Sequence, residues 1–306
     1  MAEESRFQDR VTTSSWLLPV VAACCAAIWV LENTNLQVSV WTGLACCALC
    51  TYLMAELNNQ HLLLRVRSRM VSSTFLVLWT MCGFLHPLQT AHLAVLFQVV
   101  CYHAMFGIYQ AQESPGLACL IFGCLGCLSL LAPPFLVLVP VFLITLGYFR
   151  ALSFRVFLGG MMGLLLPFFL AASVCFLTDR LDLLLGYVGL ILRSVPFQYS
   201  IFQPMWLIPV ALLLVLTVPA MVHFVQTSHQ DKVRVRALYF FMLWMEGILF
   251  LLLIGFPHLF PTLLLMLMLN SSPLIAHFLT LTHSKYTNAF FLAGLVLIGL
   301  ITFLLR

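Results

Sequence analysis

Three polar side chains lie deep inside long apolar stretches of the sequence: Glu246, Asn270 and Gln98. Each is eight to ten residues from one end of its stretch, which at ~1.5 Å per residue is about 12–15 Å below a bilayer surface. An ionised carboxyl at that depth costs at least ~2.5 kcal/mol, so Glu246 should face other helices, carry a proton or be paired. Pro273 should interrupt its helix and leave backbone carbonyls available. The residues predict either a polar pocket or proton relay, or an interhelical hydrogen bond of about 1 kcal/mol that specifies packing.

Charged residues between the apolar stretches suggest a second chemistry, the transfer of a sugar from a lipid phosphate. Glu32 follows the first stretch and has the right type to activate an acceptor hydroxyl as a general base. Arg180 or Arg193, in a later loop, could bind the departing phosphate. The alternative is that these are ordinary loop residues, because short connections between helices need polar side chains in any case.

Cysteine and histidine are frequent, with 11 and 9 residues, but their spacing does not favour a metal site. The pairs Cys47-x-x-Cys50 and Cys124-x-x-Cys127 lie inside apolar stretches, where cysteine acts as a small apolar residue. No two histidines have the spacing that puts two ligands on one helix face. We therefore expect no metal ion and no cofactor. Gly159-x-x-x-Gly163 predicts a close contact between helices.

The composition shows which elements must position these residues. Of 306 residues, 63% are hydrophobic and 8% are charged, and the mean hydropathy is +1.08. So few charges cannot cover a soluble surface, which excludes soluble enzymes and nucleic-acid modules and predicts an all-α, polytopic bundle of transmembrane helices. A span needs roughly 20 apolar residues. The eleven predicted spans are 15–31, 40–57, 71–85, 89–109, 116–131, 134–149, 156–177, 205–226, 237–255, 260–281 and 288–305.

The Lys and Arg residues determine the predicted orientation. If the segment 178–204 is not counted as a span, eleven of them lie on one side of the membrane and three on the other. The N-terminus is then cytoplasmic and the C-terminus outside. The segment 178–204 has only ten largely apolar residues in a row, so we expect an interfacial or re-entrant segment on the outer face. No linker or repeat divides the chain, which predicts one integral-membrane helical domain over residues 1–306.

Several loop features follow one another in a recognisable order. They are Glu56-Leu-Asn-Asn-Gln, Arg67-x-Arg69, a helix end at His86-Pro87, Leu-Ser-Leu-Leu-Ala-Pro-Pro at 128–134, Arg150 to Arg155 with Gly159 through Pro167, the basic turn at 232–236 and the Asn270 helix. With these features, over most of its length, the chain resembles an uncharacterised family of multi-pass inner-membrane proteins found in Bacteroidota. The resemblance implies a multi-pass protein of the bacterial inner membrane and carries no activity with it.

More distantly, the chain resembles polytopic glycosyltransferases that use polyprenyl-phosphate sugars, which have an acid after the first helix and an Arg-rich loop after a mid-chain proline turn. It departs from them because its first outer loop is too short for their second acid. The likeness implies a cell-envelope biogenesis protein that handles a lipid-linked saccharide. The alternatives are a transporter or flippase that uses the mid-membrane polar layer, and a non-enzymatic subunit of a membrane complex. The expected partners are the lipid bilayer, a polyprenyl-phosphate-linked saccharide and other membrane proteins, but no nucleic acid.

Overall fold

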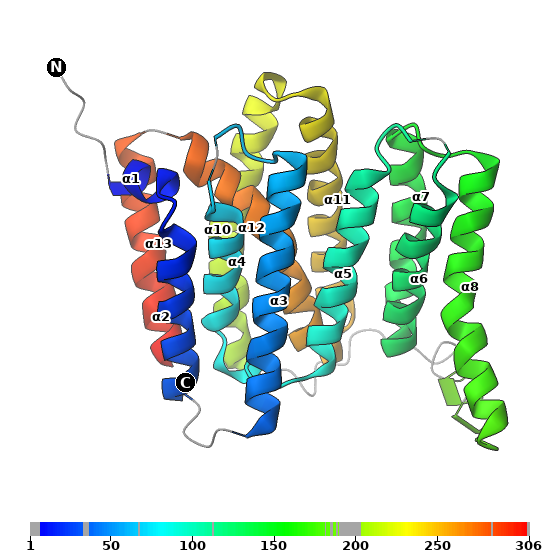
Figure 1. Cartoon of the computed structure of the whole chain (residues 1–306). Helices are drawn as coiled ribbons and strands as arrows, with labels where there is room; N and C mark the ends of the chain where they lie inside the picture. Colours follow the sequence, from blue (N-terminus) through cyan, green and yellow to red (C-terminus); the bar gives the residue numbers. More distant parts are fainter. Residues whose placement is uncertain are drawn as a thin grey trace. The chain divides into compact units, whose positions relative to one another are not determined.

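The computed structural model of the chain, shown in Figure 1, describes residues 7–32, 37–66, 68–111, 113–180, 182–183, 186–187, 189, 203–282 and 284–304. Within these ranges the chain forms twelve α-helices, which confirms the predicted all-α class. The chain separates into two compact units. Unit 1 comprises residues 1–92, 202–250 and 261–306, and unit 2 comprises residues 93–201 and 251–260. The single domain over 1–306 stays a prediction.

Unit 1 contains a buried centre and a more exposed periphery. Its helices are α1 (Phe7–Thr13), α2 (Leu17–Glu32), α3 (Val38–His61), α4 (Met70–Thr80), α10 (Leu207–Thr227), most of α11 (Val233–Gly255), most of α12 (Phe260–Leu281) and α13 (Lys285–Leu304). Of the most apolar part of α12, 89% is buried, against 17% of α13. Polar groups on α12 are therefore shielded from lipid and need partners inside the protein.

The first two helices of unit 1 form a sharp corner. α1 and α2 meet at an angle of 95° around Ser14 and Ser15. The Gln8 side chain anchors α1, because its amide donates hydrogen bonds to the carbonyls of Leu279 at 2.6 Å and Thr282 at 3.0 Å. These carbonyls lie where α12 ends and lack the donors of a continuing helix. α1 therefore lies across the end of α12, and α2 begins at the same end of unit 1.

Unit 2 is built on a glycine-lined contact. Its helices are most of α5 (Thr90–Gly107), α6 (Pro115–Leu131), α7 (Leu138–Tyr148) and α8 (Phe154–Leu177). A Cβ atom added at Gly163 of α8 would overlap the Cys119 carbonyl of α6, and one at Gly159 would lie 2.7 Å from the Pro115 carbonyl. Only residues without a side chain allow this approach of two backbones. The predicted role of Gly159-x-x-x-Gly163 in close helix packing agrees with this contact.

The prediction of eleven spans requires correction. Among the described residues, seven helices are long and apolar enough to cross a membrane, or eight if the bent pair α1 and α2 counts as one span. Three predicted spans contain only the shorter helices Met70–Thr80, Pro115–Leu131 and Pro133–Tyr148. Pro133 and Pro134 divide two of these, and the first ends because the chain turns at Gly83. The orientation stays a prediction, and most of the segment 178–204 lies outside the described residues.

Candidate functional site

A buried carboxyl group joins α11 to α12 in unit 1. Glu246 lies near the middle of α11 and has no exposed surface. Asn270 of α12 donates a hydrogen bond of 2.6 Å from Nδ2 to Glu246 Oε2 and another of 2.8 Å to the Met242 carbonyl. The Ser271 hydroxyl oxygen lies 2.6 Å from Glu246 Oε1. The structure therefore brings together two of the three residues of the predicted mid-membrane layer.

The contacts of Ser271 bear on the proton of Glu246. Ser271 Oγ also lies 2.8 Å from the Leu267 carbonyl, and a hydroxyl has a single proton to donate. When Ser271 donates to Leu267, the contact with Glu246 is a hydrogen bond only if the carboxyl group donates it. When Ser271 donates to Glu246 instead, the Leu267 carbonyl keeps the backbone N–H of Ser271 as its helical partner, so the cluster accommodates Glu246 either protonated or ionised.

Pro273 does not interrupt α12, which continues to Leu281. Proline lacks the N–H that would bond to the Leu269 carbonyl, but the Ser272 hydroxyl donates to that carbonyl at 2.9 Å. The expected break and the expected open carbonyls are therefore wrong. Side-chain hydroxyls often replace the missing donor in this way when proline lies within a membrane helix.

Gln98, the third residue of the predicted layer, belongs to unit 2. It lies in α5 and is nearly buried, and its amide donates a hydrogen bond of 3.1 Å to the Tyr102 hydroxyl on the next turn of the same helix. That Gln98 lies in one polar layer with Glu246 and Asn270 stays a prediction.

A second buried acid of unit 1 lies just before α11. Arg65 Nε donates to Asp231 Oδ1 at 2.6 Å, and Arg65 also donates to the Gln230 side chain at 2.9 Å. On the other side of the carboxylate, His277 Nε2 lies 3.2 Å from Asp231 Oδ2. His277 is in α12 and is fully buried, and its Nδ1 has no hydrogen-bond partner among the described residues. This pair combines a carboxylate that orients an imidazole with an imidazole nitrogen that remains available for a proton.

Aromatic side chains surround His277 and extend toward the Glu246 cluster. The Tyr239 ring packs against the imidazole with centroids 5.0 Å apart, and the Tyr239 hydroxyl donates to the Pro273 carbonyl at 3.4 Å. His223 of α10 lies 6.0 Å from His277 by ring centroids. This cluster was not predicted from the sequence. The available indications were a histidine in an apolar helix and an acid beside a basic turn, and both also suit the end of a helix.

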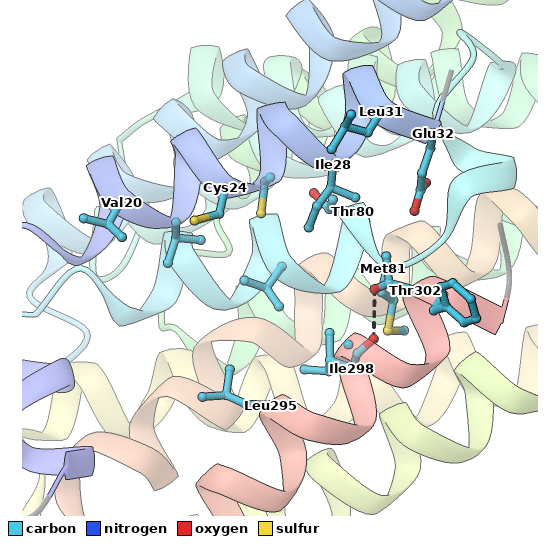
Figure 2. Close-up of a pocket in the computed structure, with 15 residues that line it drawn as sticks. Val20, Cys24, Ile28, Leu31, Glu32, Thr80, Met81, Leu295, Ile298 and Thr302 are labelled. Carbon is cyan, nitrogen blue, oxygen red and sulfur yellow. Dashed lines mark hydrogen bonds between the residues drawn. The ribbon is translucent and has the colours of Figure 1, made fainter. Parts of the chain in front are cut away.

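Glu32 lies at the other end of α2 and borders an apolar cavity of about 460 Å³ (Figure 2). Its Oε2 lies 3.5 Å from Nδ1 of His86, and the Trp29 ring stacks on the imidazole with centroids 3.9 Å apart. Gly43 of α3 makes room for the loop that carries His86, because a Cβ atom there would overlap the His86 carbonyl. Glu32 is therefore in contact with a buried histidine at this end of unit 1.

The protonation of His86 follows from its surroundings. Burial lowers the pKa of the His86 imidazole to about 4, although its hydrogen bond to the Thr80 carbonyl partly opposes this shift. The neutral ring must donate from Nε2 to that carbonyl, 3.2 Å away, so Nδ1 carries a lone pair. The contact with Glu32 is favourable when a proton lies on either of the two facing atoms, His86 Nδ1 or Glu32 Oε2. The general-base role of Glu32 stays a prediction.

The two arginines predicted to bind a lipid phosphate are placed only in part. Arg180 belongs to unit 2, where it follows the end of α8 and is exposed. Arg193 lies outside the described residues. Their roles stay predictions.

Metal binding has no obvious site in the ranges that the structure describes, where no three His, Cys, Asp or Glu side chains gather closely enough to hold an ion. Cys47, Cys50 and Cys124 are free thiols that lie buried within helices α3 and α6. Buried cysteine of this kind packs as a small apolar side chain.

Comparison with known proteins places this polytopic helical membrane protein in a family. Residues 13–306 match the family described as "Family of unknown function (DUF6427)". No curated protein and no solved structure matches the chain. The more distant likeness to glycosyltransferases gains no support from these comparisons. Because the match covers nearly the whole sequence, the chain belongs to the DUF6427 family of unknown function.

Proposed function

We propose that this protein is a membrane transporter whose cycle includes a proton carried by Glu246. The main support is the contact of Glu246 with Ser271 and Asn270, which holds a carboxyl group without exposed surface near the middle of a helix. An acid inside a membrane helix is costly, and it commonly belongs to a proton or substrate pathway. The contacts with Asn270 and Ser271 accommodate both the protonated and the ionised carboxyl group, as a side chain that takes up and releases a proton requires.

Other titratable pairs in unit 1 support a path for that proton. Asp231 borders a polar cavity of about 1000 Å³ and contacts His277, which is about 9 Å from Ser271 along α12. At the opposite end of α2, Glu32 contacts His86 beside the cavity of Figure 2. Proton-carrying side chains thus lie at both ends of unit 1 as well as in its middle.

The hypothesis of sugar transfer with Glu32 as base has less support. The two arginines predicted to hold the departing phosphate give it no support, because Arg180 belongs to the other unit and Arg193 lies outside the described residues.

The test is proton entry into liposomes that contain the purified protein and a trapped pH-sensitive dye. A potassium gradient with valinomycin makes the interior negative and drives protons inward. We expect the wild-type protein to acidify the interior faster than protein-free liposomes do. Glu246→Gln should remove this difference, because the amide keeps the shape and the contacts with Asn270 and Ser271 but cannot exchange a proton.

Glu113→Gln is the matched control, since Glu113 is an exposed acid in the loop between α5 and α6. It should acidify the liposomes at the wild-type rate. Equal rates for the wild-type protein and Glu246→Gln would contradict the proposal, and so would a wild-type rate no higher than that of protein-free liposomes.

A further inference from the structure

A large polar cavity lies at the end of unit 1 where α2 begins and α3 ends. Its volume is about 1000 Å³, and it is lined by the corner between α1 and α2, the last residues of α3, residues 62–66, 68 and 69, and the segment 230–232. Ser68 is held by two hydrogen bonds, because Asn58 donates to its carbonyl at 3.0 Å and its hydroxyl donates to the Thr12 carbonyl at 2.5 Å. These contacts hold the backbone directly before Arg69.

An apolar groove continues from this cavity between α2 and α3. Its volume is about 670 Å³, and it shares Ser15, Asn59 and Arg69 with the cavity. The α2 residues that line it run from Leu18 to Trp29, which at ~1.5 Å per residue is about 16 Å. That length is close to half of the ~30 Å hydrocarbon core of a bilayer, so the groove matches the tail region of one leaflet.

The charges around the cavity leave cations available for a ligand. The Arg65 guanidinium is already paired with Asp231 at 2.6 Å. By contrast, the side chains of Arg69 and Lys232 form no hydrogen bond or ion pair with any residue that the structure describes. Glu56 is the acid of the groove, and the Gln60 amide donates to its carboxyl group at 2.8 Å. Arg69 therefore stands unneutralised where the polar cavity meets the apolar groove.

We propose that the cavity and groove together bind a phosphate-bearing membrane lipid. The phosphate lies in the cavity against Arg69 and Lys232, and one acyl chain lies in the groove between α2 and α3. A guanidinium is well suited to phosphate because it offers two parallel N–H donors. A free anion would leave the groove empty, and a wholly apolar ligand would leave the two cations unused. This site does not include Glu246, and Asp231, which also borders the cavity, is already paired with Arg65, so lipid binding can be tested separately from the proton-coupled function proposed above.

Native mass spectrometry of the detergent-solubilised full chain with added phosphatidylglycerol tests the proposal. Arg69→Gln removes the cation, and Ala48→Phe fills the groove from α3 with an aromatic ring. Each variant should weaken lipid binding about tenfold. Arg69→Gln loses a charge-assisted contact with the phosphate, and Ala48→Phe loses a similar amount of packing against the acyl chain. Arg69→Lys should restore part of the affinity. Arg155→Gln changes an exposed cation at the start of α8 and should bind lipid as the wild type does.

Two further ligands identify which part of the lipid is recognised. Inorganic phosphate and diacylglycerol, which carry the head and the tail separately, should each compete only weakly with phosphatidylglycerol. Phosphate that competes as strongly as the lipid would overturn the proposal, and so would diacylglycerol that does. Unchanged binding in both Arg69→Gln and Ala48→Phe would also overturn it. Glu246→Gln should bind the lipid normally, which separates this result from a failure of the transport proposal.

Discussion

Two helix pairs of this protein are held together by opposite means. In unit 2, α6 and α8 approach so closely at Gly163 that no side chain fits between their backbones. In unit 1, α11 and α12 are joined by hydrogen bonds to the carboxyl group of Glu246. The first contact uses only van der Waals packing, which is the ordinary source of helix association in lipid. The second places an ionisable group where a hydrocarbon side chain would be easier to bury.

The difference between the two helix pairs supports the transport proposal for α11 and α12. Neither α6 nor α8 contains an acid or a histidine, although their contact is close along much of their length. A membrane helix pair therefore does not need a carboxyl group for stability. The acid in α11 is more easily explained by a proton that must be held inside the membrane, as the transport proposal requires.

The largest expected effect comes from closing the glycine contact. Gly163→Ala puts a methyl group onto the Cys119 backbone, which cannot move aside as a flexible side chain would. Overpacking of this kind costs about 1–3 kcal/mol, and a backbone obstacle should give ~3 kcal/mol. The free energy of unfolding in mixed detergent micelles measures it. Gly116→Ala in α6 is the control, because nothing lies within 4 Å of its added methyl, and it should leave the stability unchanged or slightly higher.

A smaller loss is expected when the polar contact is broken. Asn270→Ala removes the donor to Glu246 Oε2 inside the protein and a second donor to the Met242 carbonyl, which keeps the N–H of its own helix. We expect a loss of about 1–2 kcal/mol, near the upper limit for interhelical hydrogen bonds in membranes. The same unfolding measurement applies. Asn59→Ala, at an exposed position, should change the stability by less than ~0.5 kcal/mol. Similar values for the two variants would remove the distinction between the helix pairs.

The length of the apolar stretches predicted the helices well but predicted the spans less well. Every predicted span contains an α-helix, because apolar runs that end at Gly, Pro or charge have few other structures in a bilayer. Crossing also requires length. α4 stops at Thr80, and the chain then turns so that His86 can reach Glu32, a contact between residues far apart in sequence. Hydropathy averages over such a turn and cannot detect it.

Of the two polar clusters around α12, one was predicted from the sequence and the other was not. Depth along a helix can be counted from sequence, and that count brought Glu246 and Asn270 to one level, where the structure joins them at 2.6 Å. Asp231 and His277 escaped notice because each lies near a helix end, where polar residues are common. Their contact depends on how α12 packs against the loop before α11, and this register is not encoded in any local pattern.

The smallest predicted effect concerns two serine hydroxyls that donate to backbone carbonyls. One replaces a donor that proline lacks, and the other adds to a donor that is already present. Ser272 donates to the Leu269 carbonyl, whose helical partner would be the absent N–H of Pro273, so Ser272→Ala should cost about 1 kcal/mol of unfolding free energy. Ser173 of α8 makes a similar contact of 2.8 Å with the Phe169 carbonyl, but that carbonyl also has the ordinary N–H of its own helix. Ser173→Ala should therefore cost less than ~0.5 kcal/mol. If the two variants unfold alike, the continuity of α12 through Pro273 does not depend on the Ser272 hydroxyl.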